Sequence, residues 1–247
     1  PNIIISDGQG YYVWLRSIFF DFDLNLTNDY VLIMNPEIFD SSNHIKNLAG
    51  NATSKYPIGI SISMIPGFLI GHVIALLMSF ELDGVSDPYQ LSIASYISAL
   101  TLFSFYFFYK SLCTISNNKV TAFILVVIAI LSTNLIYYLT KEPAMSHCLN
   151  VAMLNFLLSF GIKIQNENFI FNNLNIFIIS LCGGLLFLQR FSNIFLMPFL
   201  VYLYLPLFRK NNIRWITQLL FSLFFLISLQ LLILSSFSHC CNVISVT

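Results

Sequence analysis

The chain after residue 58 is a succession of apolar segments joined by short polar loops, and this pattern limits the possible folds more than any other feature. Only 9% of the 247 residues are charged and 57% are hydrophobic, whereas a soluble domain carries roughly 25% charged residues. A soluble core cannot bury this much apolar surface, so the sequence predicts an integral membrane protein. We expect an all-α fold, a polytopic transmembrane helical bundle, with apolar segments at 58–80, 91–109, 120–139, 146–162, 174–188, 192–208 and 215–237.

The distribution of charge divides the chain into three parts. Nine of the eleven acidic residues lie before residue 90, and the net charge is +0 without a basic stripe, which argues against a nucleic-acid partner. We expect an acidic-aromatic loop at 1–57, an apolar segment at 58–80 and the helical bundle at 81–247. Because the chain begins with Pro1 and ends shortly after an apolar run, we expect it to be truncated at both ends and to lack an upstream membrane helix.

The acidic-aromatic loop begins with a helix signal. Ser6 and Gln9 match a capping box, which predicts a helix starting near Asp7. Trp14 and the neighbouring tyrosines suit a membrane–water interface. We therefore expect this helix to lie on the bilayer and not to pass through it. Residues 34–57 are rich in Asn, Ser, Gly and Pro, which is typical of a loop.

The apolar segment 58–80 allows two topologies. It is interrupted by Gly59, Pro66, Gly67, Gly71 and His72. Lys and Arg concentrate in the loops at 110–119, 163–173 and 209–214, which predicts that those loops are cytoplasmic and that the loop at 81–90 is extracytoplasmic. If 58–80 spans the bilayer, the acidic-aromatic loop is cytoplasmic. If 58–80 is a broken juxtamembrane or re-entrant helix, that loop is extracytoplasmic, and the internal Pro and Gly favour this topology, although spanning helices tolerate such residues too.

The cysteines and His72 have simple structural interpretations. No two cysteines form a C-x-x-C pair, and most lie in apolar runs, so we expect small buried hydrophobic residues and neither a disulfide framework nor a metal site. His72 lies in an apolar segment and is interpreted as a packed or interfacial histidine.

Several carboxylates are candidates for chemistry. Asp7 at a helix start could act as a general base, or it could simply suit the helix dipole. Asp21, Asp23 and Asn25 form D-x-D-x-N, but Leu26 and Leu32 stand where a calcium loop needs Gly and Glu. We therefore reject a calcium loop, and a solvated polar turn is the alternative.

Three further ionisable residues lie at boundaries between apolar runs. Glu142 and His147 could be functional, as ionisable residues at a membrane boundary often are, or they could form a polar helix cap. Arg190 could bind a phosphate through two parallel hydrogen bonds, or extend its charged end to lipid headgroups. Lys55 and Tyr56, just before Pro57, could meet a phosphate or a headgroup in the same way.

The order of these motifs resembles a family. The stretches DGQGYYVWLRSIFFDFD, KYPIGISISMIPGFLIGH, LTKEPAMSH and GGLLFLQRFSNIFLM are similar in their order and chemistry to the membrane glycosyltransferases of the GT-C fold, such as the protein mannosyltransferases and the lipid A aminoarabinose transferases. In this family an acidic motif opens the first extracytoplasmic loop, which carries juxtamembrane helices. The family often has Asp-Glu at that position, whereas here Asp7 is followed by Gly8, so a role for paired carboxylates in binding a metal is in doubt.

The resemblance implies a role for each candidate. It implies that Asp7 and Glu142 are catalytic and that Arg190 and Lys55 bind the donor phosphate. Supporting residues are expected to be Tyr11, Tyr12, Asp21, Asp23 and His147. No cofactor is fixed by the resemblance, and a divalent metal stays open.

The implied reaction moves a sugar from a polyprenyl-phosphate donor to a glycan, lipid or protein acceptor. The implied location is the bacterial inner membrane, with the active site on the extracytoplasmic face. Two alternatives belong to other classes. A transporter or lipid-linked-sugar flippase also uses broken helices and boundary charges, and a non-catalytic membrane subunit would not need Asp7, Glu142 and Arg190 to converge.

Overall fold

The computed structural model describes residues 3–23, 25–34, 52, 54–166 and 173–209, and these residues are the basis of every structural statement that follows. They form helices joined by turns, as the all-α prediction requires. The elements are α1 (Asp7–Arg16), the π-helical turn η1 (Ser17–Asp21), α2 (Thr27–Ile33), α4 (Gly59–Leu77), α5 (Asp87–Ser116), α6 (Lys119–Leu131), α7 (Leu135–Thr140), α8 (Ser146–Gln165), α9 (Asn173–Gln189), the 3₁₀ turn η2 (Phe191–Leu196) and α10 (Met197–Arg209).

Three described helices, α4, α5 and α8, are long and apolar enough to cross a membrane. The helices α6, α9 and α10 are apolar but shorter. The predicted segment 120–139 is divided into α6 and α7 by a turn at 132–134. The predicted segment 215–237 and most of the loop at 34–57 lie outside the described residues.

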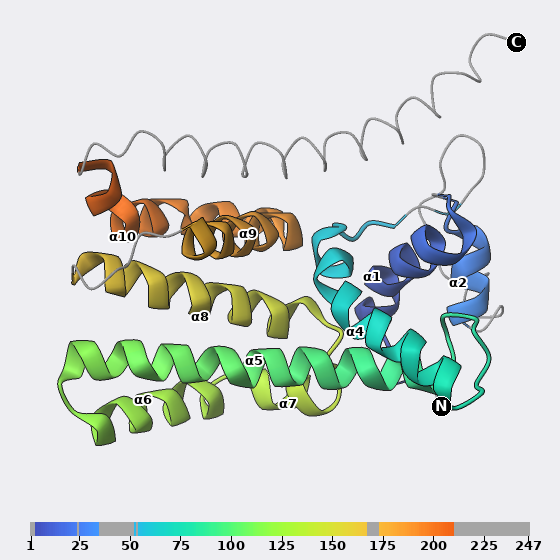
Figure 1. The fold of residues 1–247 in the computed structure, drawn as a ribbon, viewed down its shortest axis with the longest axis horizontal. Coiled ribbons are helices and arrows are strands. Elements are labelled where there is room, and N and C mark those ends of the chain that lie inside the picture. Colours follow the sequence, from blue (N-terminus) through green and yellow to red (C-terminus); the bar gives the residue numbers. More distant parts are fainter. Residues whose placement is uncertain (1–2, 24, 35–51, 53, 167–172, 210–247) are drawn as a thin grey trace, which may run out of the picture.

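The longest described helix, α5, is the one against which the others are arranged (Figure 1). Its second half packs on α8, where Thr101 Oγ1 donates to the Cys148 carbonyl at 3.2 Å and Asn155 Nδ2 donates to Ser104 Oγ at 3.0 Å. The helices α9 and α10 pack on α8, and α6 packs on α5. The first half of α5 packs on α4, which carries α1 and α2. We call the α1–η1–α2 region the head.

The boundary between α5 and α6 follows from two asparagines. Asn117 ends α5 in the left-handed region at φ 51°, which asparagine tolerates better than most residues. Asn118 caps α6, because its side-chain oxygen accepts a hydrogen bond from the Val120 N–H at 2.9 Å. The two helices can therefore fold back on each other through a tight turn.

The helix α4 is continuous from Gly59 to Leu77, so the prediction of a break within 58–80 is wrong. Pro66 lies inside it and is exposed. Proline removes one helical hydrogen bond, but packing of the opposite face of α4 on α5 and the head holds the helix together.

The glycines of α4 allow close packing of helices. A Cβ atom on Gly71 would lie 2.6 Å from Tyr89 Cα, and one on Gly59 would lie 2.4 Å from the Leu188 carbonyl carbon. Only glycine permits the backbones of α5 and α9 to approach this closely. The residues that the sequence suggested as helix breakers therefore serve as contact points.

The interpretations of His72 and of the cysteines are confirmed where the structure describes them. His72 Nδ1 lies 2.7 Å from the Tyr89 hydroxyl, so this histidine is packed. Cys148 and Cys182 are buried, and Cys113 is half-buried; all three are free thiols. The cysteines at 240 and 241 lie outside the described residues.

The aromatic residues of α1 lie inside the protein. Trp14 is 3% exposed, and Tyr11, Tyr12 and Leu15 are buried with it. The expectation that these rings face a membrane–water interface is therefore wrong. They form the core of the head because α4 and α2 cover them. The predicted helix start at Asp7 is confirmed, but without a capping hydrogen bond from the Ser6 side chain.

Candidate functional site

Asp7, the first residue of α1, is exposed, and its carboxylate is held by a residue far along the chain. The Tyr56 hydroxyl donates to Asp7 Oδ1 at 2.5 Å. Burial and, after it, the hydrogen bond to Asp7 hold the pKa of Tyr56 well above its ordinary range, so this phenol remains a donor at physiological pH. A carboxylate can accept on both oxygens, so Asp7 Oδ2 can still accept a proton from a bound hydroxyl.

The ring of Tyr56 is seated against α1 by several contacts. Trp14 Nε1 donates to the Tyr56 carbonyl at 3.3 Å, and Ser54 Oγ donates to the Gly10 carbonyl at 2.9 Å. The Tyr11 and Tyr56 ring centroids lie 4.8 Å apart. Gly10 is required for this seat, because a Cβ there would lie 2.1 Å from the Tyr56 ring. The bond between Tyr56 and Asp7 therefore depends on the absence of a side chain at position 10.

Tyr11 lies one turn after Asp7 and connects it with two elements from later in the chain. The Ser146 side chain, at the first residue of α8, and the charges of Asp7 and Arg190 all act on the pKa of the Tyr11 phenol. Burial raises the pKa of Tyr11, Ser146 and Arg190 oppose this rise, and Asp7 adds to it. The same two charges act on the His147 imidazole. The charges of Asp7 and Arg190 therefore both act on Tyr11 and on His147.

Arg190 occupies the junction between α9 and η2. Its backbone is extended, with φ −151° and ψ 129°, and its side chain is exposed. The preceding residue is fixed in the interior, where Gln189 Nε2 donates to Ser63 Oγ of α4 at 3.0 Å. The junction is therefore anchored in the interior by Gln189, whereas the guanidinium of Arg190 is exposed on the surface.

Lys55 lies beside the residue that holds Asp7. Its ammonium is 5.1 Å from the centroid of the Tyr56 ring, and the side chain is exposed. This geometry fits a cation–π contact. A role for Lys55 in binding a phosphate stays a prediction.

Glu142 is connected to the same region through aromatic residues. The Tyr137 hydroxyl donates to Glu142 Oε1 at 3.0 Å. The Tyr137 ring contacts the Tyr138 ring, which stacks on His147 with centroids 4.2 Å apart. Among the described contacts none joins Glu142 directly to Asp7, so a catalytic role for Glu142 beside Asp7 stays a prediction.

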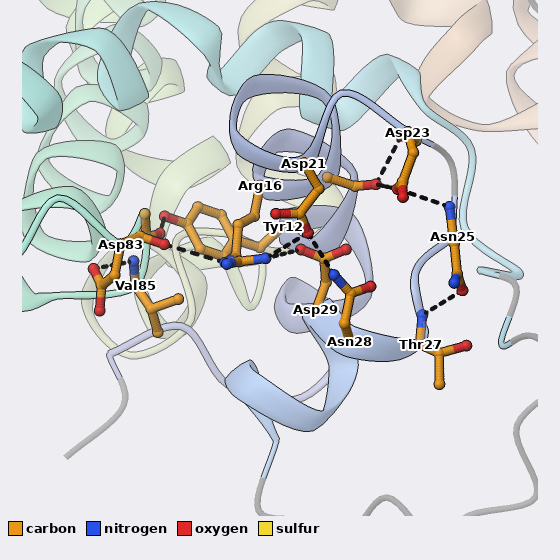
Figure 2. A network of polar contacts seen from close by, with 12 residues as sticks. Tyr12, Arg16, Asp21, Asp23, Asn25, Thr27, Asn28, Asp29, Asp83 and Val85 are labelled. Atoms are coloured by element: carbon orange, nitrogen blue, oxygen red, sulfur yellow. Dashed lines mark hydrogen bonds and ion pairs between the residues drawn. The ribbon is translucent and has the colours of Figure 1, made fainter.

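Asp21 belongs to a separate polar network around Arg16 in the head, shown in Figure 2. Arg16 Nη1 lies 2.8 Å from Asp21 Oδ2 and 2.6 Å from Asp29 Oδ1, and Arg16 Nε donates to the Asp83 carbonyl at 3.1 Å. The network ties η1, α2 and the loop between α4 and α5 together. The structure assigns Asp21 to this network and does not bring it to Asp7.

Asp23 and Tyr12 also stabilise the head. Ser17 Oγ donates to Asp23 Oδ1 at 3.1 Å, and the Asn25 N–H donates to the same oxygen at 3.0 Å. Tyr12 points away from Tyr11, and its hydroxyl donates to the Gly84 carbonyl. Both residues were predicted to support the site, and both instead fix the turn and the loop that surround Arg16.

Asp29 gives this network a pH dependence that can be measured. Its side chain is 0% exposed, and Oδ2 has no hydrogen-bond partner. Burial raises the pKa of Asp29 to about 6 from an ordinary 3.8, and Arg16 opposes the rise. Because the folded protein binds this proton more tightly than the unfolded chain, the stability from Asp29 is complete below about pH 4 and is lost as the pH rises through about 6.

We expect the melting temperature in detergent to contain a component that falls between pH 4 and 6 and that Asp29→Asn removes. A difference of about two pH units between folded and unfolded pKa corresponds to about 3 kcal/mol of unfolding free energy. Asp23→Asn, which changes an exposed acid in the same region, should keep the component. Identical pH profiles for Asp29→Asn and the wild type would contradict this account.

Ligands for a metal are not gathered in the described residues. No group of three or more His, Cys, Asp and Glu side chains that could hold a metal ion occurs among them. Asp7, His147 and the other described acids therefore do not form a metal centre.

Comparisons with protein-family models, with curated proteins and with solved structures found no match.

Sequence reasoning missed three residues that define the region. Tyr56 was paired with Lys55 as a possible phosphate or headgroup contact and not as a partner of Asp7, and Ser146 and Gly10 were not singled out. Each acts through a partner between 44 and 135 positions away along the chain (Ser54 and Tyr56 for Gly10, Asp7 for Tyr56, Tyr11 for Ser146). No local pattern in a single sequence predicts such pairs.

Proposed function

We propose that this protein is an integral membrane glycosyltransferase that moves a sugar from a polyprenyl-phosphate donor to an acceptor hydroxyl. The proposal is supported by an exposed carboxylate, Asp7, and an exposed guanidinium, Arg190, which lie 183 residues apart in the chain and whose charges act on the same two residues, Tyr11 and His147. Transfer from a phosphate needs both a base for the acceptor and a positive charge for the leaving group.

Asp7 is the base in the proposed reaction. The acceptor oxygen attacks the anomeric carbon of the sugar while Asp7 Oδ2 takes the hydroxyl proton. The bond between that carbon and the phosphate oxygen breaks, and its electron pair stays on the phosphate. Tyr56 holds Asp7 Oδ1 through its hydroxyl, which fixes the orientation of the carboxylate.

Arg190 receives the phosphate. Charge on the phosphate grows as the sugar leaves, and a guanidinium can bind two of its oxygens in parallel. The N-terminus of the 20-residue helix α8 lies in the same region through Ser146 and His147, and free backbone N–H groups there favour an anion as well. Lys55 adds a further positive charge next to Tyr56.

The three apolar helices α4, α5 and α8 support a membrane location for this chemistry, and a polyprenyl donor is itself a membrane lipid. We propose that the site faces the extracytoplasmic side, because Lys110 in the last turns of α5 and Lys119 at the start of α6 lie at the opposite end of α5 from the head. The acceptor class, whether glycan, lipid or protein, is not distinguished by these residues.

We expect Arg190→Gln to weaken binding of undecaprenyl phosphate to the purified full chain in nanodiscs by about 10- to 100-fold, since a hydrogen bond between charged groups contributes about 1.5–3 kcal/mol. Native mass spectrometry with undecaprenyl phosphate and, in parallel, with phosphate-free undecaprenol measures the effect. Binding of undecaprenol should not depend on Arg190.

A matched control is Lys110→Gln, which removes an exposed cation that lies over an aromatic ring, Tyr106, in the second half of α5. It should bind undecaprenyl phosphate as the wild type does. Equal loss in both variants would mean that the phosphate is attracted by overall charge, and unchanged binding by Arg190→Gln would overturn the assignment of Arg190.

A further inference from the structure

The helix α4 carries an exposed face that is wholly apolar. Leu69, Ile70, Val73, Leu76 and Leu77 are between 47% and 77% exposed. Their spacing of three and four residues puts them in one stripe along the helix. No charged residue occurs within α4. Apolar side chains exposed in such a stripe need a cover other than water.

The opposite face of α4 is covered by the head along most of its length. Ser61 Oγ donates to the Tyr11 carbonyl at 2.6 Å near the start of the helix. Near its middle, the Phe68 ring lies 5.3 Å from Phe19 and 6.0 Å from Phe20. Beyond its end, Arg16 bonds to the loop at Asp83. The head and α4 are therefore one packed unit.

This packing is incompatible with α4 as a membrane-spanning helix. Its 19 residues would span about 28 Å, close to the hydrocarbon thickness of about 30 Å, so Phe68 at its midpoint would lie at the bilayer centre. Phe20 contacts Phe68, and Asp21 follows directly. The ion pair of Asp21 with Arg16 and the non-helical backbone at 22–23 and 25–26 would then also lie at hydrocarbon depth.

Such burial is costly on two grounds. Ionised side chains at the centre of a bilayer are strongly disfavoured, and irregular backbone exposed to lipid does not occur there. Asp23 and Asn25 in this segment are exposed on the protein surface, so the protein itself does not shield them. The head therefore lies outside the hydrocarbon region of the bilayer. Because α4 packs along the head, α4 also lies outside a membrane-spanning position.

We infer that α4 does not cross the membrane but lies against it, with the stripe of Leu69, Ile70, Val73, Leu76 and Leu77 in contact with the lipids of the leaflet next to the head. The stripe is apolar and uncharged, as contact with acyl chains requires, and α4 packs directly on α5, which is itself long and apolar enough to span. The inference is independent of the proposed chemistry. It places Asp7 and the loop that follows α4 on the same side of the membrane.

The test measures the depth of the stripe. The full chain, with its five cysteines replaced by alanine, carries a single nitroxide-labelled cysteine at Leu69, Val73 or Leu77 in phosphatidylcholine–phosphatidylglycerol vesicles. A fourth variant, Phe103→Cys on α5, serves as the reference because Phe103 is 55% exposed near the middle of that helix. Relaxation by oxygen and by a water-soluble nickel complex reports the depth of each label.

We expect all three α4 labels to lie at headgroup or upper acyl-chain depth and none to be as deep as the label at 103. A spanning α4 would instead bring the label at 69 to the depth of the label at 103 and leave the label at 77 about 12 Å shallower, since a helix rises 1.5 Å per residue. That result overturns the inference. Full exposure of all three labels to the nickel complex overturns it as well, because something other than lipid would then cover the stripe. The labelled variants should melt like the cysteine-free parent.

Discussion

Asp7→Asn is expected to lower sugar transfer by about 100- to 10,000-fold, the usual contribution of a general base, while folding and membrane insertion are unchanged. Asp7 is exposed, and the amide oxygen of asparagine can still accept the hydrogen bond from Tyr56. The variant therefore keeps the geometry and loses only the proton acceptor. The measurement is consumption of undecaprenyl-phosphate-linked glucose, mannose, galactose or 4-amino-4-deoxyarabinose, using whichever donor the wild type consumes.

Two comparisons separate a chemical role for Asp7 from a structural one. Glu81→Gln removes an exposed acid from the loop after α4 and should leave turnover unchanged. Binding of undecaprenyl phosphate to Asp7→Asn should equal that of the wild type, because Arg190 holds the phosphate in the proposed site. Undiminished turnover by Asp7→Asn would refute Asp7 as the base. A wild-type chain that consumes none of these donors and binds no undecaprenyl phosphate would refute the transferase itself.

Gly10→Ala is expected to lower transfer at least about 10-fold and to lower the melting temperature as well. The new methyl group would lie 2.1 Å from the Tyr56 ring, a distance at which the ring has to move. Movement of Tyr56 breaks its hydrogen bond to Asp7 and releases the carboxylate from its fixed orientation. Tyr56→Phe tests the bond alone, since it keeps the ring and removes the donor, and it should lower transfer without the loss of stability.

The control for this substitution is Gly183→Ala. Gly183 also lies in a helix, α9, but nothing lies within 4 Å of a Cβ added there. Alanine is preferred over glycine in a helix by roughly 0.5–1 kcal/mol, so Gly183→Ala should stabilise slightly or be neutral. In a Tyr56→Ala background the ring is absent, so Gly10→Ala should cause no further loss of stability relative to Tyr56→Ala alone, while transfer stays low. Full activity of Gly10→Ala would mean that Tyr56 does not position Asp7.

Residues of the same type make different contacts in the structure, and their positions along the chain do not reveal which contacts each one makes. Tyr11 and Tyr12 are neighbours, yet Tyr11 meets Ser146 and the charges of Asp7 and Arg190, whereas Tyr12 bonds to the loop at Gly84. Successive residues of a helix point about 100° apart. Which direction leads to the site is decided by the elements that pack there, and those come from later in the chain.

The acidic residues show the same limit. Asp7, Asp21 and Asp23 look alike as surface carboxylates in an aromatic stretch, and the resemblance to a glycosyltransferase family assigned all of them to one site. Arg16 lies between α1 and the later α2, so it draws Asp21 and Asp29 into an ion-pair network. A guanidinium binds whichever carboxylates the fold brings within hydrogen-bond distance. The sequence alone does not give the distances between Arg16 and these carboxylates.

What the sequence by itself determined follows from composition and local periodicity. The lack of charge and the apolar segments predict helices suited to a membrane, and the signal at Ser6 predicts the start of α1 at Asp7. The formation of helices and their affinity for a membrane depend on neighbouring residues and on the transfer of apolar side chains out of water. A short stretch of sequence is enough to indicate both. They were predictable for that reason.

Only the tertiary structure decided which distant residues meet. It brought Tyr56 to Asp7 and Arg190 to the same region, made the glycines of α4 into contact points, and laid the head along that helix. Each of these depends on close packing between elements that are separate in the chain, where a shift of about one atom's width makes or breaks a contact. A hydrophobic pattern is set by nearby residues and survives small changes of side-chain shape. A contact between side chains joins residues far apart in the chain and depends on their shape.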